Sequence, residues 1–472
     1  MRLLKKVLLW GGSVVLVLVL LFVVLVGPWP VYSATNYDRS SYYKKSLADV
    51  DSAAQEAHLS QTPGRLQAGW AAREIVPPPG TPLAGYGARN GKSSTGTHDP
   101  LFARALVLSD GEDTVALVGA DMLLIPPKVA ELCAKAVAEK TPLMENDILY
   151  HASHTHCGPG GLMEGLMAKS VFGAYRPEMP PLVAKAFSDA IVDAYENMKP
   201  ASLGQGAVDA AQYIRNRSRE ARVDSTLNVA LIEQEGGARC YMVRFSGHPT
   251  MYGSDMLQFS AEYPGAVMRH IEKDTGGKAM YLGGALGSMS TRGGDESGRD
   301  ERIDAFGSAL AQLAEEKANT LTLENKLDIT SLSVSVGMPS IQCRPMSPSW
   351  RLSPIAARFA GLDGKGHIQL ARIGSMMLVG VSFDFSGEVS DDWQAWARSR
   401  GYNLWPTSFA PGYCGYLSPD KYYKEEDKEG GLGYEIGLMN WYGPNTEAYF
   451  TALFHRAAED LGPALNNPAP QS

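Results

Sequence analysis

The N-terminus is the feature that most restricts how this chain can fold. An uncharged apolar run extends from Val7 to about Gly27, directly after the basic residues Arg2, Lys5 and Lys6. A helix needs about 20 apolar residues to cross a bilayer, whereas the apolar core of a signal peptide usually has roughly 7 to 15. The run therefore predicts a membrane-spanning helix ahead of a separate folded body.

The basic flank also predicts on which side of the membrane that body lies. Lysine and arginine beside a membrane-spanning helix stay in the cytoplasm, so the residues after Gly27 are expected on the periplasmic or extracellular side. The alternative is a cleaved signal, because the segment from Val31 to Ala34 reads "VYSA" and could serve a signal peptidase. The two interpretations predict a membrane-anchored and a secreted protein respectively, and both export the body.

The rest of the 472 residues divides into two further segments. Residues 35–66 are polar and predict a spacer above the membrane. From Ala68 onward, β-branched apolar runs alternate with stretches of helical period, as in the hairpin pattern of residues 104–125 and the helical pattern of residues 126–140. Residues 67–465 are therefore expected to form one α/β domain in which helices sandwich mixed β-sheets, although the strand order does not follow from the pattern.

Composition excludes some partners. Hydrophobic residues make up 44% and charged residues 20%, which is normal for a folded globular protein. The net charge of -8 argues against nucleic acid, because binding to phosphates needs a basic face. The five cysteines are widely spaced without a CxxC pair, so a disulfide framework is not expected.

The segment of residues 151–161, "HASHTHCGPGG", carries the strongest chemical signal. It follows a short apolar strand pattern, and α/β folds usually place ligand groups at strand ends. If the segment is extended, His154 and His156 point to the same side, because side chains alternate with a period of two. Such a pair can share a metal, or one histidine can bind metal while the other transfers protons. A satisfied pair of buried histidines is the structural alternative.

Three other loops that follow apolar strands add candidate groups. "RFSGHPTMYG" supplies His248, and "SFDFSGEVSDDW" supplies Glu388, with Asp384 as a rival carboxylate. "APGYCGYLSPDKYY" supplies Tyr413 and Tyr416. Each residue alone has an ordinary structural explanation, such as a carboxylate at a helix N-terminus or a packed tyrosine. Together, two histidines, a carboxylate and an oxygen ligand would make a catalytic zinc site, provided that the loops meet.

"HTHCGPGG" resembles the "HTHSGPGG" segment of the neutral/alkaline ceramidases. Further segments that resemble this family follow in the same order along the chain, from Ala68 to Gly443: "GWAAREIVPPPGTPLAGYGAR", "IRNRS", "SGHPT", "ALGSMS", "SGE" and "YCGYLSP". Because these segments are collinear, the resemblance covers nearly all of the body.

The resemblance implies a zinc-dependent amidohydrolase that cleaves the N-acyl amide bond of ceramide-like lipids into a sphingoid base and a fatty acid. It implies one Zn²⁺ per chain. The family's metal ligands fall on His154, His248, Glu388 and Tyr416.

The resemblance also implies four catalytic residues. His156 would transfer protons, Arg217 and Tyr434 would stabilise the oxyanion or orient the substrate, and Ser290 would bind the polar head of the lipid. The segment "GSMST" around Ser290 lacks the aspartate and proline of the family, which makes Ser288 a rival. The family's C-terminal β-domain is expected to be missing, because the chain ends soon after its last helical pattern.

The sequence leaves two alternatives to ceramide hydrolysis open. One is a zinc hydrolase of a different N-acyl amide or ester, and the other is a non-catalytic, membrane-anchored binding protein. A serine hydrolase of the GxSxG type is not expected, because the chain has no such motif.

Overall fold

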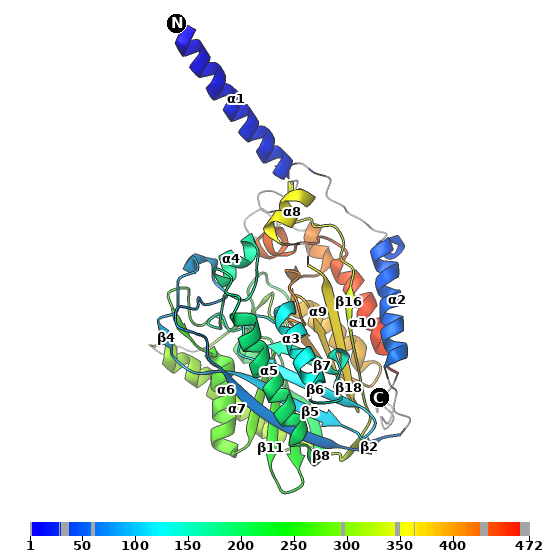
Figure 1. Cartoon of the computed structure of the whole chain (residues 1–472). Helices are drawn as coiled ribbons and strands as arrows, with labels where there is room; N and C mark the ends of the chain where they lie inside the picture. Colours follow the sequence, from blue (N-terminus) through cyan, green and yellow to red (C-terminus); the bar gives the residue numbers. More distant parts are fainter. Residues whose placement is uncertain are drawn as a thin grey trace.

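Two β-sheets packed face to face form the centre of the molecule, and helices cover both outer faces (Figure 1). The computed structural model describes residues 2–27, 29, 37–57, 62–293, 298–344, 350–362, 364–424 and 433–462. The expected α/β fold with helices sandwiching mixed sheets is confirmed.

The larger sheet has eight strands in the order β13-β11-β10-β8-β3-β5-β6-β7. In chain order these are β3 (Gln67–Ile75), β5 (Leu101–Ser109), β6 (Thr114–Ala120), β7 (Ile148–Ala152), β8 (Lys199–Asp209), β10 (Thr226–Gln234), β11 (Arg239–Phe245) and β13 (Lys278–Gly283). The smaller sheet has the order β16-β18-β19-β21, formed by β16 (Ile329–Val336), β18 (Gly366–Ile373), β19 (Met376–Val381) and β21 (Asn403–Ser408).

Helices pack on the outer face of each sheet. On the larger sheet lie α3 (Pro127–Ala138), α5 (Met179–Glu196), α6 (Glu262–Thr275) and α7 (Arg299–Ala318). On the smaller sheet lie α2 (Ser41–Glu56), α9 (Gly387–Arg398) and α10 (Thr446–Asp460). The alternation of side chains along β5 explains the layering: Ala105 and Val107 face the helices, while Leu106 and Leu108 face the smaller sheet. The strand is apolar on both faces because both faces are covered.

Short two-stranded pairs join the loops at the edges of the sheets. They are β1 (Val26–Gly27) with β17 (Arg351–Leu352), β2 (Gly64–Arg65) with β15 (Lys326–Leu327), β4 (Gly96–Thr97) with β12 (Gln258–Phe259), β9 (Ile214–Asn216) with β14 (Met289–Thr291), and β20 (Asp384–Phe385) with β22 (Tyr416–Leu417). Two short helices, α4 (Leu166–Phe172) and α8 (Pro354–Ala360), contact each other.

Parallel strand pairs set the position of the chemically interesting loops. β6 pairs with β7, β11 with β13, and β19 with β21, and in each case a helix connects the two parallel strands. The carboxyl ends of paired parallel strands meet at one edge of a sheet. The loops that carry the candidate histidines and carboxylates therefore leave the two sheets at carboxyl ends.

The larger sheet curls, so that its two ends approach each other. β13 lies at one end of the strand order and β7 at the other, yet β13 contacts both β6 and β7. Glycines permit this approach, since a Cβ on Gly283 would lie 2.5 Å from the carbonyl oxygen of Ala152, and one on Gly119 would lie 2.9 Å from that of Tyr281. The curl brings the loop after β7 next to the loop after β11.

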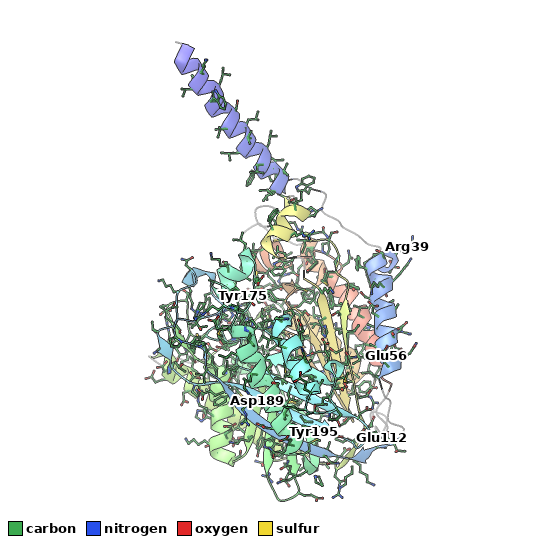
Figure 2. The ribbon with its side chains drawn as sticks, viewed as in Figure 1. Arg39, Glu56, Glu112, Tyr175, Asp189 and Tyr195 are labelled. Carbon is green, nitrogen blue, oxygen red and sulfur yellow. The ribbon has the colours of Figure 1, made fainter. Side chains whose placement is uncertain are left out.

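The apolar N-terminal run forms one exposed helix, α1 (Arg2–Leu25), which projects from one end of the body beside α8 (Figure 1). Its apolar side chains point outward along most of its length (Figure 2). By length and composition α1 could cross a membrane or act as a signal sequence. The proposed cleavage segment, Val31 to Ala34, lies outside the described residues, as do residues 463–465 at the expected end of the domain.

The expected polar spacer contains a helix that packs on the body. In α2, Val50 and Ala54 are buried in the core of the smaller sheet. The Tyr449 hydroxyl of α10 donates a hydrogen bond to the Ser46 hydroxyl over 2.8 Å. The polar residues of α2 form its exposed face, which explains why the composition of residues 35–66 suggested a free stalk. The expected absence of a disulfide framework agrees with the structure, in which all five cysteines are buried and free.

Replacing Val50 with alanine tests whether α2 belongs to the folded body. Val50 is fully buried, so Val50→Ala is expected to lower the free energy of unfolding by about 2 kcal/mol in chemical denaturation. Ser52→Ala on the exposed face of the same helix is the control and should leave stability unchanged. Equal stability of both variants and the parent would show that α2 is a free spacer after all.

Candidate metal centre

Three histidines from two loops meet at the carboxyl ends of β7 and β11. The Nε2 atom of His156 lies 3.3 Å from Nε2 of His154 and 3.0 Å from Nε2 of His248. One nitrogen from each ring lies within 4.8 Å of the other two, a spacing that could hold a metal ion. The sequence predicted this meeting only on the condition that the loops approach each other, and the curl of the larger sheet fulfils that condition.

The backbone at His154 differs from the extended conformation expected from the sequence. His154 has φ +66°, in the left-handed region that non-glycine residues seldom adopt. The next side chain fixes the loop, because the Thr155 hydroxyl donates a 2.6 Å hydrogen bond to the carbonyl of Ser260. The rings of His154 and His156 are nearly perpendicular, at 89°, with centroids 4.8 Å apart. The turn, rather than strand alternation, makes the two rings converge.

Backbone carbonyls fix the tautomers of His154 and His248. Nδ1 of His154 lies 2.6 Å from the carbonyl oxygen of Leu123, and Nδ1 of His248 lies 2.9 Å from that of Leu286. A carbonyl only accepts, so each Nδ1 carries the proton and each Nε2 presents a lone pair. Metal-binding histidines are commonly oriented in this way. Burial lowers the pKa of His154 to about 3, and that of His248 well below its usual value, so both rings are neutral at pH 7.

His156 is held differently from the other two histidines. Its Nδ1 is buried and has no hydrogen-bond partner among the described residues. The ring packs against Tyr86, with centroids 4.6 Å apart, and against Gly85, where a Cβ would lie 2.7 Å from Nδ1. No backbone group among the described residues therefore fixes the tautomer of His156.

Asp384 is the carboxylate that the described contacts bring closest to the histidines. Its Oδ2 lies 3.8 Å from Nε2 of His154 and 3.9 Å from Nδ1 of His248. Neither oxygen accepts a well-formed hydrogen bond from any residue that the structure describes. Burial raises the pKa of Asp384 to about 7, while the Arg217 guanidinium and the Tyr416 phenol lower it. A buried carboxylate without well-formed hydrogen bonds, near the Nε2 lone pair of His154, is a site that suits a cation.

Glu388, the carboxylate favoured by the sequence, is occupied elsewhere. Its Oε2 accepts a 2.9 Å hydrogen bond from the Ser288 hydroxyl, and its Oε1 accepts from the Asn216 amide and the Tyr422 phenol at 3.0 and 3.1 Å. No described contact joins Glu388 to a histidine. It lies in the first turn of α9, whereas Asp384 starts the strand β20 at the cluster. Which carboxylate binds a metal stays a prediction: the described contacts bring Asp384, the rival named by the sequence, closer to the histidines than Glu388.

Tyr416 and Arg217, which the sequence singled out, contact each other next to Asp384. Tyr416 lies opposite Asp384 in the short pair of β20 and β22. The Arg217 guanidinium donates a 2.9 Å hydrogen bond to the Tyr416 hydroxyl and two more to the carbonyl of Gly287. Arg217 also helps to lower the pKa of all three histidines, because its positive charge disfavours their protonation.

The two remaining candidates lie further out. Tyr434 is largely exposed, with its ring perpendicular to that of Tyr416 and the centroids 6.4 Å apart. Ser290 lies on β14 opposite Arg215, and its hydroxyl contacts the carbonyl of Thr291 at 3.4 Å. No contact between Ser290 and a histidine is described. Residues 425–432, just before Tyr434, lie outside the described residues.

The sequence did not single out Phe409, which follows β21. Its ring stacks on the imidazole of His154, with centroids 4.2 Å apart and an interplanar angle of 13°. Phe409 also has a positive φ of 67°, and only its position after an apolar strand could have indicated it.

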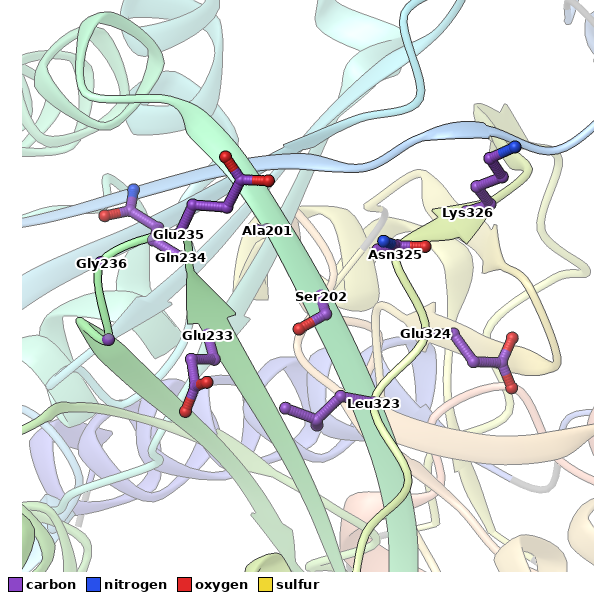
Figure 3. Close-up of a pocket in the computed structure, with 11 residues that line it drawn as sticks. Ala201, Ser202, Glu233, Gln234, Glu235, Gly236, Leu323, Glu324, Asn325 and Lys326 are labelled. Carbon is purple, nitrogen blue, oxygen red and sulfur yellow. The ribbon is translucent and has the colours of Figure 1, made fainter.

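A surface pocket elsewhere on the body has no part in this centre. It lies around the turn between β10 and β11, with Glu233, Glu235, Glu324 and Lys326 at its walls (Figure 3). That turn precedes β11, whereas His248 follows it, so the pocket lies at the opposite end of the strand. Its described walls contain no histidine.

Comparison with known proteins agrees with the family resemblance. A sequence model of the family described as neutral/alkaline non-lysosomal ceramidase, N-terminal, matches residues 66–251. The match supports the resemblance to this family over residues 66–251. This segment holds His154, His156, Arg217 and His248.

Relatives and solved structures extend the likeness beyond that segment. A neutral ceramidase of Mycobacterium tuberculosis (strain ATCC 25618 / H37Rv) is 26% identical over 224 residues, which cover 43% of this chain and 34% of the relative. The chain thus matches about a third of the length of that ceramidase. The crystal structure of the neutral ceramidase from Pseudomonas aeruginosa aligns with a TM-score of 0.70 and 19% identity, over 88% of this chain and 77% of that one. A ceramidase complexed with C2 aligns with a TM-score of 0.68 and 18% identity, over 86% and 77% of the two chains. The fold of the body is therefore ceramidase-like.

The two rival carboxylates can be separated by matched amide substitutions. Asp384→Asn is expected to weaken metal binding by more than the roughly 10- to 100-fold that loss of an outer-shell partner costs. Glu388→Gln should keep the metal and lower stability by about 1–3 kcal/mol, because the amide cannot accept all three hydrogen bonds. Elemental analysis and thermal unfolding of both variants measure these effects. The reverse pattern, with metal lost only in Glu388→Gln, would restore Glu388 as the ligand.

Proposed function

We propose that the protein is a zinc-dependent amidohydrolase that cleaves the N-acyl amide bond of ceramide-like lipids to a sphingoid base and a fatty acid. The observation that carries the proposal is the convergence of His154, His156 and His248 with the unsatisfied carboxylate of Asp384. The names of the relatives supply the substrate class, since both solved neighbours and the mycobacterial relative are ceramidases.

The donor atoms fit a zinc ion. His154 and His248 present Nε2 lone pairs in tautomers fixed by backbone carbonyls, and Asp384 presents two oxygens without well-formed hydrogen bonds from described residues. Nitrogen and carboxylate donors of this number are typical of catalytic zinc. We propose one Zn²⁺ per chain held by His154, His248 and Asp384, with the Tyr416 phenol as the fourth protein donor. The ion would polarise the amide carbonyl and lower the pKa of a water molecule to about 7.

The protein groups around the ion divide the remaining work. The Arg217 guanidinium is anchored by the carbonyl of Gly287 and reaches the Tyr416 hydroxyl, so it places fixed positive charge where negative charge develops on the carbonyl oxygen. Tyr434, at the exposed edge of the site, orients the substrate. His156 transfers the proton between the attacking water and the leaving amine, because neither of its nitrogens is fixed by the backbone.

Ser290 is proposed as a contact for the polar head of the lipid. A serine nucleophile needs a base within hydrogen-bond distance, and the hydroxyl of Ser290 contacts the carbonyl of Thr291 instead. This arrangement favours water over Ser290 as the attacking group.

The location of the enzyme follows from α1. We propose that α1 anchors the protein in a membrane, with the catalytic domain of residues 67–465 on the extracytoplasmic side. The basic residues before the apolar run support this orientation. Cleavage near Ala34 would instead yield a secreted enzyme with the same site.

Turnover of a panel of N-acyl lipids tests the proposed reaction. The full chain in detergent micelles should release fatty acid from ceramides, lose this activity with a zinc chelator and regain it when zinc is added back. Release from other N-acyl amides or from esters, but not from ceramides, would move the protein to a different hydrolase. No release from any substrate by fully zinc-loaded protein would make it a binding protein.

Substitution of two histidines tests the division of labour within the site. His156→Ala is expected to keep the zinc and lower kcat by roughly 10²- to 10⁴-fold, the usual cost of losing general acid-base help. His248→Ala should lose both zinc and activity, because it removes a ligand. Metal content and steady-state rates of both variants are compared with the parent. Loss of zinc in His156→Ala would place His156 among the ligands.

A further inference from the structure

The end of the body from which α1 emerges carries exposed apolar side chains on three separate elements. We define this apolar rim as Leu166 and Met167 of α4, Ile355 and Phe359 of α8, and Tyr434 and Leu438 of the π-helical turn η6 (Tyr434–Met439). Phe359 is 78% exposed, Leu166 68% and Ile355 58%. Scattered apolar residues are normal on a surface, but apolar groups gathered around one feature mark an interaction site.

α8 presents its apolar side chains outward. Ile355 and Phe359 are four residues apart and so lie on the same face of the helix, while Ala357 on the other face is buried. The basic residues Arg358 on α8 and Lys169 on α4 are also exposed beside the rim. This combination of apolar and basic side chains suits the boundary between acyl chains and phosphate groups of a bilayer.

Backbone hydrogen bonds tie the end of α1 directly to α8. The Ser353 amide, just before α8, donates a 2.9 Å hydrogen bond to the carbonyl of Leu25, the last residue of α1. The residues that follow Leu25 form β1, which pairs with β17, the strand just before Ser353. The ring of Phe22 on α1 also lies 6.2 Å from that of Trp350. If α1 crosses a bilayer, α8 is therefore held where the apolar stretch of α1 ends, at the membrane surface.

The same network leads from α8 to the metal centre. The Leu352 amide donates to the carbonyl of Cys343, and the Arg344 amide donates to the carbonyl of Gly437 in η6, both over 2.9 Å. η6 begins with Tyr434, whose exposed ring borders Tyr416 of the site.

α4 borders the site from another direction. The Gly85 amide donates a 3.0 Å hydrogen bond to the carbonyl of Val171 in α4, and Gly85 packs against the ring of His156. The rim thus contacts the site through both α4 and η6.

We propose that the apolar rim docks on the outer leaflet of the membrane that α1 spans, so that the site faces the bilayer and takes its lipid substrate from it. The inference rests on the proposed anchor role of α1 and on the proposed lipid substrate. A bilayer is favoured over a second copy of the chain, because the helix that would span it is fixed by hydrogen bonds to the rim.

Depth-dependent fluorescence quenching tests the docking without any measurement of activity. The native cysteines are all buried, so an introduced surface cysteine can be labelled selectively with an environment-sensitive fluorophore. The full chain is placed in phosphatidylcholine vesicles that contain nitroxide-labelled lipid. Labels in Phe359→Cys and Leu166→Cys are expected to shift to shorter wavelength and to be quenched. The control label in Glu112→Cys, at the end of the body away from α1 (Figure 2), should show neither the wavelength shift nor the quenching.

Two results of that experiment would overturn the proposal. The first is quenching at positions 359 and 166 that is no stronger than at position 112. The second is shielding of the rim labels from water that depends on the protein-to-lipid ratio rather than on lipid alone. This result would assign the rim to a second copy of the chain.

Rates on two substrate forms test whether docking serves the site. The double variant Ile355→Glu/Phe359→Glu is expected to cut hydrolysis of ceramide embedded in vesicles by about tenfold or more, because it removes apolar burial in the bilayer. Hydrolysis of a water-soluble short-chain N-acyl amide should change by less than about twofold. Met144→Glu is the control, because Met144 is an exposed apolar residue ahead of β7, at the opposite end of that strand from the site.

The outcomes separate the two proposals. Quenching at the rim without turnover of either substrate would contradict the hydrolase and leave the docking in place. Turnover of both substrates at unchanged rates in the double variant, together with unquenched rim labels, would contradict the docking and leave the hydrolase.

Discussion

The approach of β13 to β7 is the constraint on which the functional site depends. In a flat sheet with this strand order, the loops after β7 and β11 would lie six strand positions apart, because the two strands are near opposite ends of the sheet. The curl removes that separation and needs close backbone contact, which Gly119 and Gly283 permit because they lack a Cβ. The meeting of His154 with His248 is thus a property of the whole sheet and not of either loop.

Once the loops meet, buried electrostatics decide what the site can bind. Burial keeps the imidazoles neutral, and carbonyl partners direct two Nε2 lone pairs into the same space. Asp384 is close to the Nε2 lone pair of His154 and accepts no well-formed hydrogen bond from a described residue. A cation at this point would satisfy the nitrogen lone pairs and the carboxylate together, which no neutral group can do. The Arg217 guanidinium is anchored by the carbonyl of Gly287 and lowers the pKa of the same carboxylate.

The sequence predicted the elements and the chemical groups better than their arrangement. The hairpin of β5 and β6 and the helices α3 and α5 follow from apolar periodicity, which is local. The surroundings of Asp384 and Glu388 could not be predicted, because they depend on the pairing of β20 with β22 and on hydrogen bonds to Glu388 from three distant residues. The left-handed turn at His154 and the packing of α2 on the body were missed for the same reason. Both arise from contacts between segments far apart in the chain.

The position of the metal relative to these side chains tests the central claim most directly. Crystals of the zinc-loaded full chain, measured at the zinc absorption edge, locate the ion by its anomalous scattering. We expect one peak per chain at bonding distance, about 2.0–2.2 Å, from Nε2 of His154, Nε2 of His248 and an oxygen of Asp384. An anomalous peak bound to Glu388 instead, or the absence of any peak at the three histidines in zinc-loaded crystals, would contradict the account.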